Sequence, residues 1–272
     1  MPLASQSDPA TTLTVARSLG FLTVAVAAGC LLWYLRQYAQ QILAGPYRKR
    51  WRYLAVGVGA AAVYGLAGLA ETAGVTPAAS FRRGATLFVF LFAAIGVRAV
   101  HRSVDGHSLL ADETLQWAGP TVVAGFVAAW WLTYLFATPT AVAGLEVVGL
   151  LLATAYTLYH AVGTVRAEEG TSIAAFTRQF TPALVAFAVV AVADHAVALS
   201  VPAAAVGDGL ALVGTVLAGA FLFTTAVAIR QQGGEVQRLY DPTTWRRSRD
   251  TGSDPQDRLA EDGPAKEHPA DD

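Results

Sequence analysis

Residues 209–229 read GLALVGTVLAGAFLFTTAVAI and contain no ionisable side chain. A helix needs about 20 consecutive, mostly apolar residues to cross the hydrocarbon core of a bilayer, so this stretch predicts a membrane-spanning helix. Six further stretches are also long and mostly apolar, and they are separated by charged or turn-forming segments. The seven predicted spans are Thr14–Tyr38, Tyr53–Gly74, Gly84–Val100, Trp117–Phe136, Ala141–Val165, Phe180–Val201 and Asp208–Ile229. The sequence therefore predicts an all-α, integral membrane bundle of seven transmembrane helices.

Composition excludes a water-soluble globular protein. Hydrophobic residues make up 54% of the chain and charged residues 14%, with a mean hydropathy of +0.44. Soluble domains carry about 25% charged residues. The net charge of −1 provides no field that would attract nucleic acid. Cys30 is the single cysteine, which excludes an intramolecular disulfide. The excess of Arg over Lys, the abundant Ala and Val and the acidic tail are typical of a halophilic source.

Basic residues predict the orientation, because cytoplasmic loops of membrane proteins are enriched in Lys and Arg. With seven spans, one side of the membrane receives Arg48, Lys49, Arg50, Arg52, Arg98, Arg102, Arg166, Arg178, Arg230, Arg238, Arg246, Arg247 and Arg249. We therefore expect a multi-pass protein of the cell membrane with its N-terminus outside and its C-terminus in the cytoplasm. The predicted parts are a short extracellular segment (1–13), the transmembrane domain (14–230) and a disordered acidic cytoplasmic tail (231–272).

Several ionisable residues fall inside the predicted spans, where each costs a few kcal/mol and is a functional candidate by default. The predicted topology places these candidates in the outer half of the membrane: Glu71, Arg83 (or its neighbour Arg82), Glu146, Asp194, His195 and Asp208. One interpretation is an outward-facing cavity that binds a ligand or handles protons, with His195 titrating near neutral pH. The other is a set of structural salt bridges, which we favour for Glu71 and Asp208 near the membrane rim.

Asp194 and His195 are adjacent on one predicted helix and therefore point about 100° apart. They cannot both face one partner, so we expect one to meet Arg83 and the other to meet a neighbouring helix.

Small residues and aromatic residues predict how the helices pack. Gly57, Ala61 and Gly65 in the second span, and Gly214 and Ala218 in the seventh, recur at four-residue spacing, which allows close contact between helices in lipid. Pro182 is expected in the first turn of the sixth span, where proline is tolerated. The aromatic side chains at the ends of the fourth span are predicted to lie at the membrane interfaces: Trp117, Trp130, Trp131 and Tyr134.

His101 and His160 are predicted at the cytoplasmic ends of the third and fifth spans. Two histidines at matched depth can ligate one haem iron, so a haem-binding redox protein remains an alternative. His107 and His268 are expected to be solvated in a loop and in the tail. No nucleophile motif, phosphate-binding glycine loop or acidic metal-binding pair occurs in the sequence, so we expect a protein without enzymatic activity and without a resident metal.

Several short stretches, together with the seven predicted spans, resemble microbial rhodopsins. Tyr64 within AAVYGL (61–66) is similar to the tyrosine-bearing second helix of that family, and Arg83 is similar in place to its helix-three arginine. AYTLY (155–159) resembles its fifth helix, and the spacing from Pro202 to Arg230 resembles its last loop and helix.

The resemblance implies a lysine in the seventh helix that forms a Schiff base with retinal. Its expected position falls near Ala218, and this span contains no lysine, which excludes covalent retinal binding. The expected counter-ion positions fall near Gly214 and Thr86. The sixth span offers Ala186, Phe187 and Val190 where the family has tryptophans. Light-driven pumping is therefore not expected.

Three functional hypotheses follow. The first is an opsin-like, non-enzymatic sensor or accessory protein without covalent retinal, in which the outer polar cluster binds a ligand or senses protons. The second is a membrane redox protein with haem b, or a lipid-modifying enzyme, that uses His101 and His160. The third is a sensory input module for a separately encoded signalling partner. The expected partners are the lipid bilayer and an unidentified protein, and no cofactor is expected under the first hypothesis.

Overall fold

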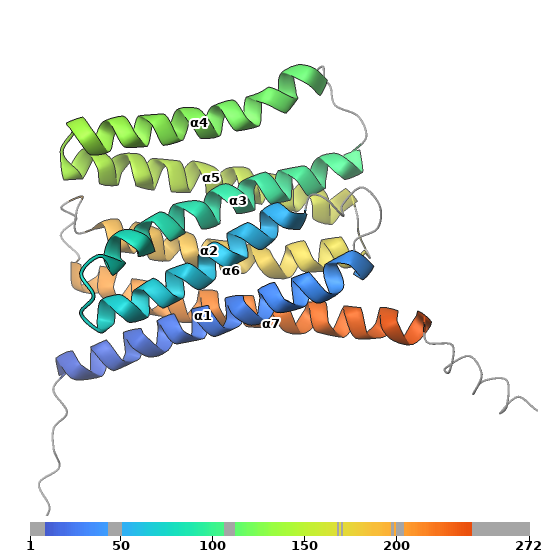
Figure 1. Cartoon of the computed structure of the whole chain (residues 1–272), viewed down its shortest axis with the longest axis horizontal. Coiled ribbons are helices and arrows are strands. Elements are labelled where there is room, and N and C mark those ends of the chain that lie inside the picture. Colours follow the sequence, from blue (N-terminus) through green and yellow to red (C-terminus); the bar gives the residue numbers. More distant parts are fainter. Residues whose placement is uncertain are drawn as a thin grey trace, which may run out of the picture. The chain divides into compact units, whose positions relative to one another are not determined.

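The computed structural model describes residues 9–42, 51–105, 112–167, 171–196 and 204–240, together with residues 169 and 199. These residues form seven α-helices (Figure 1). Their bounds are α1 Pro9–Ile42, α2 Trp51–Thr72, α3 Ala78–Asp105, α4 Asp112–Phe136, α5 Pro139–Ala167, α6 Ser172–Ala196 and α7 Ala204–Tyr240. The prediction of an all-α chain is therefore confirmed.

Within these described ranges, six helices are long and apolar enough to cross a membrane. Their apolar segments are Thr11–Tyr38, Trp51–Thr72, Ala78–His101, Pro139–Ala167, Ile173–Ala196 and Val206–Gly233. The described apolar segment of α4 is shorter and covers Ala124–Phe136. A multi-pass membrane protein is thus supported, whereas the seventh span and the orientation of the termini stay predictions.

Large apolar side chains on the outside of the helices have the distribution expected of a protein in lipid. Leu66, Phe81, Leu152 and Phe223 are among those that are exposed. Such a surface would promote aggregation in water, but it matches the hydrocarbon of a bilayer. Helices are suited to this environment because they satisfy their backbone hydrogen bonds internally.

Small residues bring the helices into close contact, as predicted. A Cβ atom at Gly65 of α2 would lie 2.6 Å from the backbone nitrogen of Ala25 on α1. Gly57 faces α3, where its Cβ would lie 3.4 Å from the nitrogen of Ala93. The two faces of α2 therefore pack against α1 and α3. Neighbouring contacts join α3 to α5, α5 to α6, and α4 to α5.

Glycines also allow helix α7 to pack closely against two neighbouring helices. A Cβ atom at Gly219 would lie 2.9 Å from the Thr23 side chain of α1, and one at Gly214 would lie 2.7 Å from the Val190 side chain of α6. The described part of α7 near these glycines thus lies between α1 and α6.

A tight turn sets the register between α2 and α3. The amide of Val75 donates to the carbonyl of Ala70, and the amide of Gly74 donates to the carbonyl of Glu71. Gly74 has φ +88°, so this is a Schellman motif with glycine in the left-handed conformation. The turn ends α2 just after Glu71 and lets α3 begin at Ala78, which brings the two helix ends together.

Several predicted helix bounds need correction. Helix α3 begins at Ala78 rather than near Gly84, so Arg82 and Arg83 lie inside it. Helix α6 begins at Ser172 rather than Phe180, which places Pro182 in the helix interior and not in its first turn. There the proline removes the amide that would bond to the carbonyl four residues earlier. Helix α7 continues to Tyr240, past the predicted boundary at residue 231.

Candidate functional site

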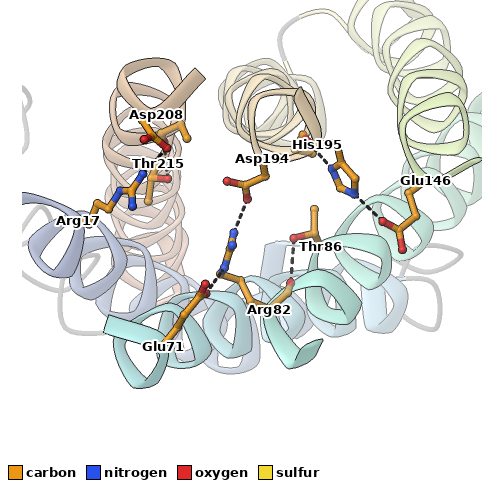
Figure 2. Close-up of polar contacts among 11 residues, drawn as sticks. Arg17, Glu71, Arg82, Thr86, Glu146, Asp194, His195, Asp208 and Thr215 are labelled. Atoms are coloured by element: carbon orange, nitrogen blue, oxygen red, sulfur yellow. Dashed lines mark hydrogen bonds and ion pairs between the residues drawn. The ribbon is translucent and has the colours of Figure 1, made fainter. Parts of the chain in front are cut away.

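Most of the ionisable residues predicted inside the spans gather where α2 and α6 end and where α3, α5 and α7 begin (Figure 2). The structure divides them into three groups of contacts rather than one site. We call them the Arg82 network (Glu71, Arg82 and Asp194), the Glu146–His195 pair, and the Arg17–Asp208 pair.

The Arg82 network joins three helices through one guanidinium group. Arg82 Nε on α3 donates to Glu71 Oε2 on α2 at 2.6 Å, and Arg82 Nη1 donates to Asp194 Oδ2 on α6. The Arg82 side chain is 13% exposed, and the two carboxylates are more open. Arginine suits this position because its planar guanidinium presents several donors at once.

Aromatic rings enclose the buried side of this network. The Arg82 guanidinium carbon lies 5.9 Å from the centroid of the Phe21 ring and 5.9 Å from that of the Tyr64 ring. Tyr64 is 1% exposed. Its hydroxyl oxygen is the one buried side-chain polar atom without a hydrogen-bond partner among the residues that the structure describes. A buried, unpaired hydroxyl is costly, which makes this atom an anomaly.

The Glu146–His195 pair is the most buried polar contact at this end. His195 Nε2 on α6 lies 2.5 Å from Glu146 Oε2 on α5, and the two side chains are 9% and 5% exposed. His195 Nδ1 lies 2.6 Å from the carbonyl oxygen of Ala191. Trp130 Nε1 on α4 donates to Glu146 Oε1 at 2.8 Å. The contact therefore joins α4, α5 and α6.

The hydrogen-bond pattern defines how many protons this pair holds. A backbone carbonyl only accepts, so His195 Nδ1 carries a hydrogen. The contact between Nε2 and Oε2 needs one more proton, which lies either on the imidazole, giving an ion pair, or on the carboxyl, giving a neutral pair. Both forms have no net charge. Gain or loss of a proton would leave a net charge in a buried position.

The third group lies at the rim. Arg17 Nη2 on α1 donates to Asp208 Oδ1 on α7 at 2.5 Å, and both side chains are exposed. Exposed ion pairs contribute little to stability, typically about 0–1 kcal/mol. This agrees with the structural interpretation given to Asp208.

One predicted contact needs correction. Arg83, or its neighbour Arg82, is expected in the cluster, with Arg83 as the partner of Asp194 or His195; the structure gives the salt bridges to Arg82, while Arg83 is exposed. Adjacent residues point about 100° apart on a helix, so only one of the two arginines faces α2 and α6. Arg83 stays within electrostatic range of Glu146 and His195. The divergence of Asp194 and His195 is as expected: Asp194 faces Arg82, and His195 faces Glu146 on the neighbouring helix (Figure 2).

Trp130 was missed as a site residue because it was interpreted as an interfacial aromatic. Its distance along the chain from the link between α4 and α5 indicates that it contacts Glu146. In an antiparallel helix pair, residues equally far from the turn meet, and residues 130 and 146 are symmetric about Thr138 in the short link between α4 and α5.

The two histidines of the haem alternative meet at the other end of α3 and α5. His101 Nδ1 and His160 Nδ1 are 3.1 Å apart. Haem iron would need one imidazole on each face of the porphyrin, and rings in direct hydrogen-bond contact leave no space for that plane. The pair as arranged here does not fit a bis-histidine haem. His107 and His268 lie outside the described residues.

The position where the resemblance implies a retinal lysine is closely packed. Ala218 is fully buried. The Tyr64 and Phe187 rings meet edge to face at 5.4 Å between centroids. The neighbouring gap is lined by residues of α2, α3, α6 and α7, among them Gly57, Ala61, Val89, Phe187 and Leu222, and it does not admit a water molecule.

The fold and these buried polar pairs define a helical, multi-pass membrane protein. Comparisons with family models, with curated proteins and with solved structures give no match to this chain. Its function therefore has to be inferred from the residues themselves.

Proposed function

We propose that this chain is a seven-span, non-enzymatic sensor or accessory protein of the cell membrane, with its N-terminus outside, and that it responds to protons at the Glu146–His195 pair. The observation that carries the proposal is the 2.5 Å contact between two almost fully buried ionisable side chains on different membrane helices. Ionisable residues inside a membrane are expensive and are functional candidates for that reason.

Protonation of this pair would change a buried charge. Histidine is the side chain whose charge ordinarily changes between about pH 5 and 8. A second proton would leave the pair positive, and loss of the shared proton would leave it negative. Either charge is costly at low dielectric, and Arg83 on α3 adds to the cost of a positive pair. A change in proton count therefore disfavours the present contact between α5 and α6.

The adjacent residue offers a path from this event to the other helices. Asp194 precedes His195 on α6 and binds Arg82, which also binds Glu71. Movement of α6 would therefore pull on α2 and α3 as well as on α5. This arrangement suits a sensor, because a local charge change is transmitted to several helices that reach the opposite side.

Helix α4 is proposed as the seventh span. Its Trp130 bonds to Glu146, so it lies beside α5 at the depth of the buried pair. The link between the two helices is only Ala137 and Thr138, which suits an antiparallel helix pair. A helix held beside α5 in this way would follow it across the bilayer.

A relationship to microbial rhodopsins is also proposed. The resemblance gives Arg83 the place of the helix-three arginine and Tyr64 a place in helix two, and the neighbouring Arg82 contacts the Tyr64 ring, which supports the proposal. Without a lysine near Ala218, such a relative would have lost retinal chemistry and kept the bundle.

The proton response is tested by unfolding the purified protein in mixed micelles with increasing dodecyl sulfate between pH 5 and 9. We expect the wild-type midpoint to fall on the alkaline side, because the unfolded side chains lose the shared proton above about pH 6.5 while the buried pair keeps it, and we expect His195→Gln to flatten this fall. Asp208→Asn, at the exposed rim, is the matched control and should keep the wild-type profile. An unchanged alkaline-side fall in His195→Gln would contradict the proposal.

A further inference from the structure

His101 on α3 and His160 on α5 form a second contact between ionisable side chains, which is partly buried and lies towards the C-terminal ends of the two helices, away from the Glu146–His195 pair. Their Nδ1 atoms are 3.1 Å apart, and their ring centroids are 5.1 Å apart with a tilt of 59°. We propose that this pair is a binding site for one divalent cation of the borderline transition-metal class (Zn²⁺, Ni²⁺ or Cu²⁺), held through both Nδ1 atoms.

The distance between the two nitrogens is the distance that such a cation requires. A bond from a metal of this class to an imidazole nitrogen is about 2.0–2.1 Å long. Two neighbouring ligands subtend about 90° in square-planar and about 109° in tetrahedral coordination. These values place the nitrogens about 2.9–3.4 Å apart. Because 3.1 Å lies inside this range, rotation of the rings suffices to make their lone pairs converge.

Neighbouring residues hold both rings in place. The Tyr156 and Tyr159 rings pack edge-on against His160, with centroids 4.5 Å and 5.2 Å from its own. His101 lies over Gly163, where a Cβ atom would come within 2.2 Å of its Nε2. Only glycine leaves room for the ring at this point of α5. Packing keeps the two rings at this separation, so that metal binding requires them to rotate but not to approach each other.

The proton balance of the step is simple for two neutral rings. In the hydrogen-bonded pair one ring carries its hydrogen on Nδ1 and donates it to the other ring. On metal binding this ring moves its hydrogen to Nε2 through solvent, and both Nδ1 lone pairs then bind the cation. No oxidation or bond cleavage is involved.

Imidazole donors also select the class of metal. They suit zinc, copper and nickel, whereas magnesium and calcium prefer oxygen ligands. Among the described residues no third His, Cys, Asp or Glu joins the pair.

The test uses Cu²⁺ as the probe and electron paramagnetic resonance as the readout. The full chain is purified through an affinity tag without histidine, and His107→Gln and His268→Gln form the background. We expect one Cu²⁺ per chain with a nitrogen hyperfine pattern of two imidazoles. His101→Gln or His160→Gln should weaken binding by more than about tenfold, while His195→Gln on the other contact should not change it.

Two glycine substitutions on α5, one as the test and one as its control, keep the experiment valid if the histidine variants fail to fold. Gly163→Ala should weaken Cu²⁺ binding because its methyl group displaces the His101 ring. Gly144→Ala lies on the same helix with nothing within 4 Å of its Cβ and should bind like the parent. The proposal is overturned if the parent shows no two-nitrogen Cu²⁺ signal, or if His160→Gln and Gly163→Ala bind Cu²⁺ as the parent does.

Discussion

Arg82 and Arg83 show how much depends on the direction of one side chain. The two residues have the same chemistry and adjacent positions, but Arg82 joins α2, α3 and α6, while Arg83 is exposed. The sequence predicts an arginine in the cluster because the charge falls next to an apolar span. It does not identify which one, because the direction depends on where α3 begins, and that depends on the turn at Gly74.

Replacement of the two arginines should therefore have unequal effects. Arg82→Gln leaves Glu71 and Asp194 without their cation, and we expect the free energy of unfolding to fall by about 2 kcal/mol. This is less than the roughly 3–5 kcal/mol typical of fully buried pairs, because the carboxylates are partly exposed. Arg83→Gln should change it by less than about 0.5 kcal/mol. Unfolding in dodecyl sulfate measures both, and equal losses would contradict the assignment.

The hydroxyl group of Tyr64 gives a second test at the residue scale. This oxygen is buried and makes no hydrogen bond of normal geometry, although Thr215 and Arg82 lie close enough to interact with it. Tyr64→Phe removes the hydroxyl group and keeps the ring contacts with Phe21 and Phe187. We expect the free energy of unfolding to stay equal or to rise by about 1 kcal/mol. Tyr134→Phe, at an exposed position, is the control. A clear loss of stability in Tyr64→Phe would show that the hydroxyl group has a partner.

At the scale of helices, apolar length predicts that a helix exists more reliably than it predicts where the helix ends. Seven helical stretches are expected and seven helices occur in the described residues. Helices α3, α6 and α7 nevertheless extend several residues beyond the predicted spans. The physical reason is that the apolar stretch matches only the part of a helix that lies in the hydrocarbon layer. The helix itself continues into the membrane interface wherever no residue stops it. Pro182 does not stop α6 because the surrounding helices hold the chain.

The spacing of small residues predicts the close contacts between helices correctly. Two glycines of α2 make it possible to measure the effect of helix packing separately from the effect of helix propensity. Gly65→Ala would place its methyl group 2.6 Å from the backbone of α1, whereas Gly59→Ala meets nothing within 4 Å. We expect Gly65→Ala to lower the free energy of unfolding by about 1–3 kcal/mol. Gly59→Ala should leave it unchanged or raise it by up to about 1 kcal/mol. Similar effects of both substitutions would argue against the packing of α1 on α2.

For the whole molecule, the number of spans decides on which sides of the membrane the two termini lie. Seven spans place them on opposite sides, and six spans place them on the same side. Epitope tags at residues 1 and 272, probed with antibody on intact and on permeabilised cells, measure this directly. We expect the N-terminal tag to be accessible on intact cells and the C-terminal tag only after permeabilisation, as the distribution of basic residues predicts. Two tags on the same side would remove α4 as a span.

Pairing across helices is the part of the site that hydropathy alone does not predict. Glu146 and His195 are 49 residues apart in the chain and meet only because α5 and α6 pack with matching depth. The sequence marks both as ionisable residues inside spans, but the partner of each depends on helix rotation. Only the pairs that flank a short link, such as Trp130 with Glu146, follow from position.

The most direct test of the proton-responsive pair is an infrared difference spectrum of the protein in liposomes between pH 10 and pH 7. The account predicts a change in the carboxyl and carboxylate bands that is absent in Glu146→Gln and altered in His195→Gln, because the pair gains its shared proton on acidification. A difference spectrum that is the same in wild type and in both variants would contradict it.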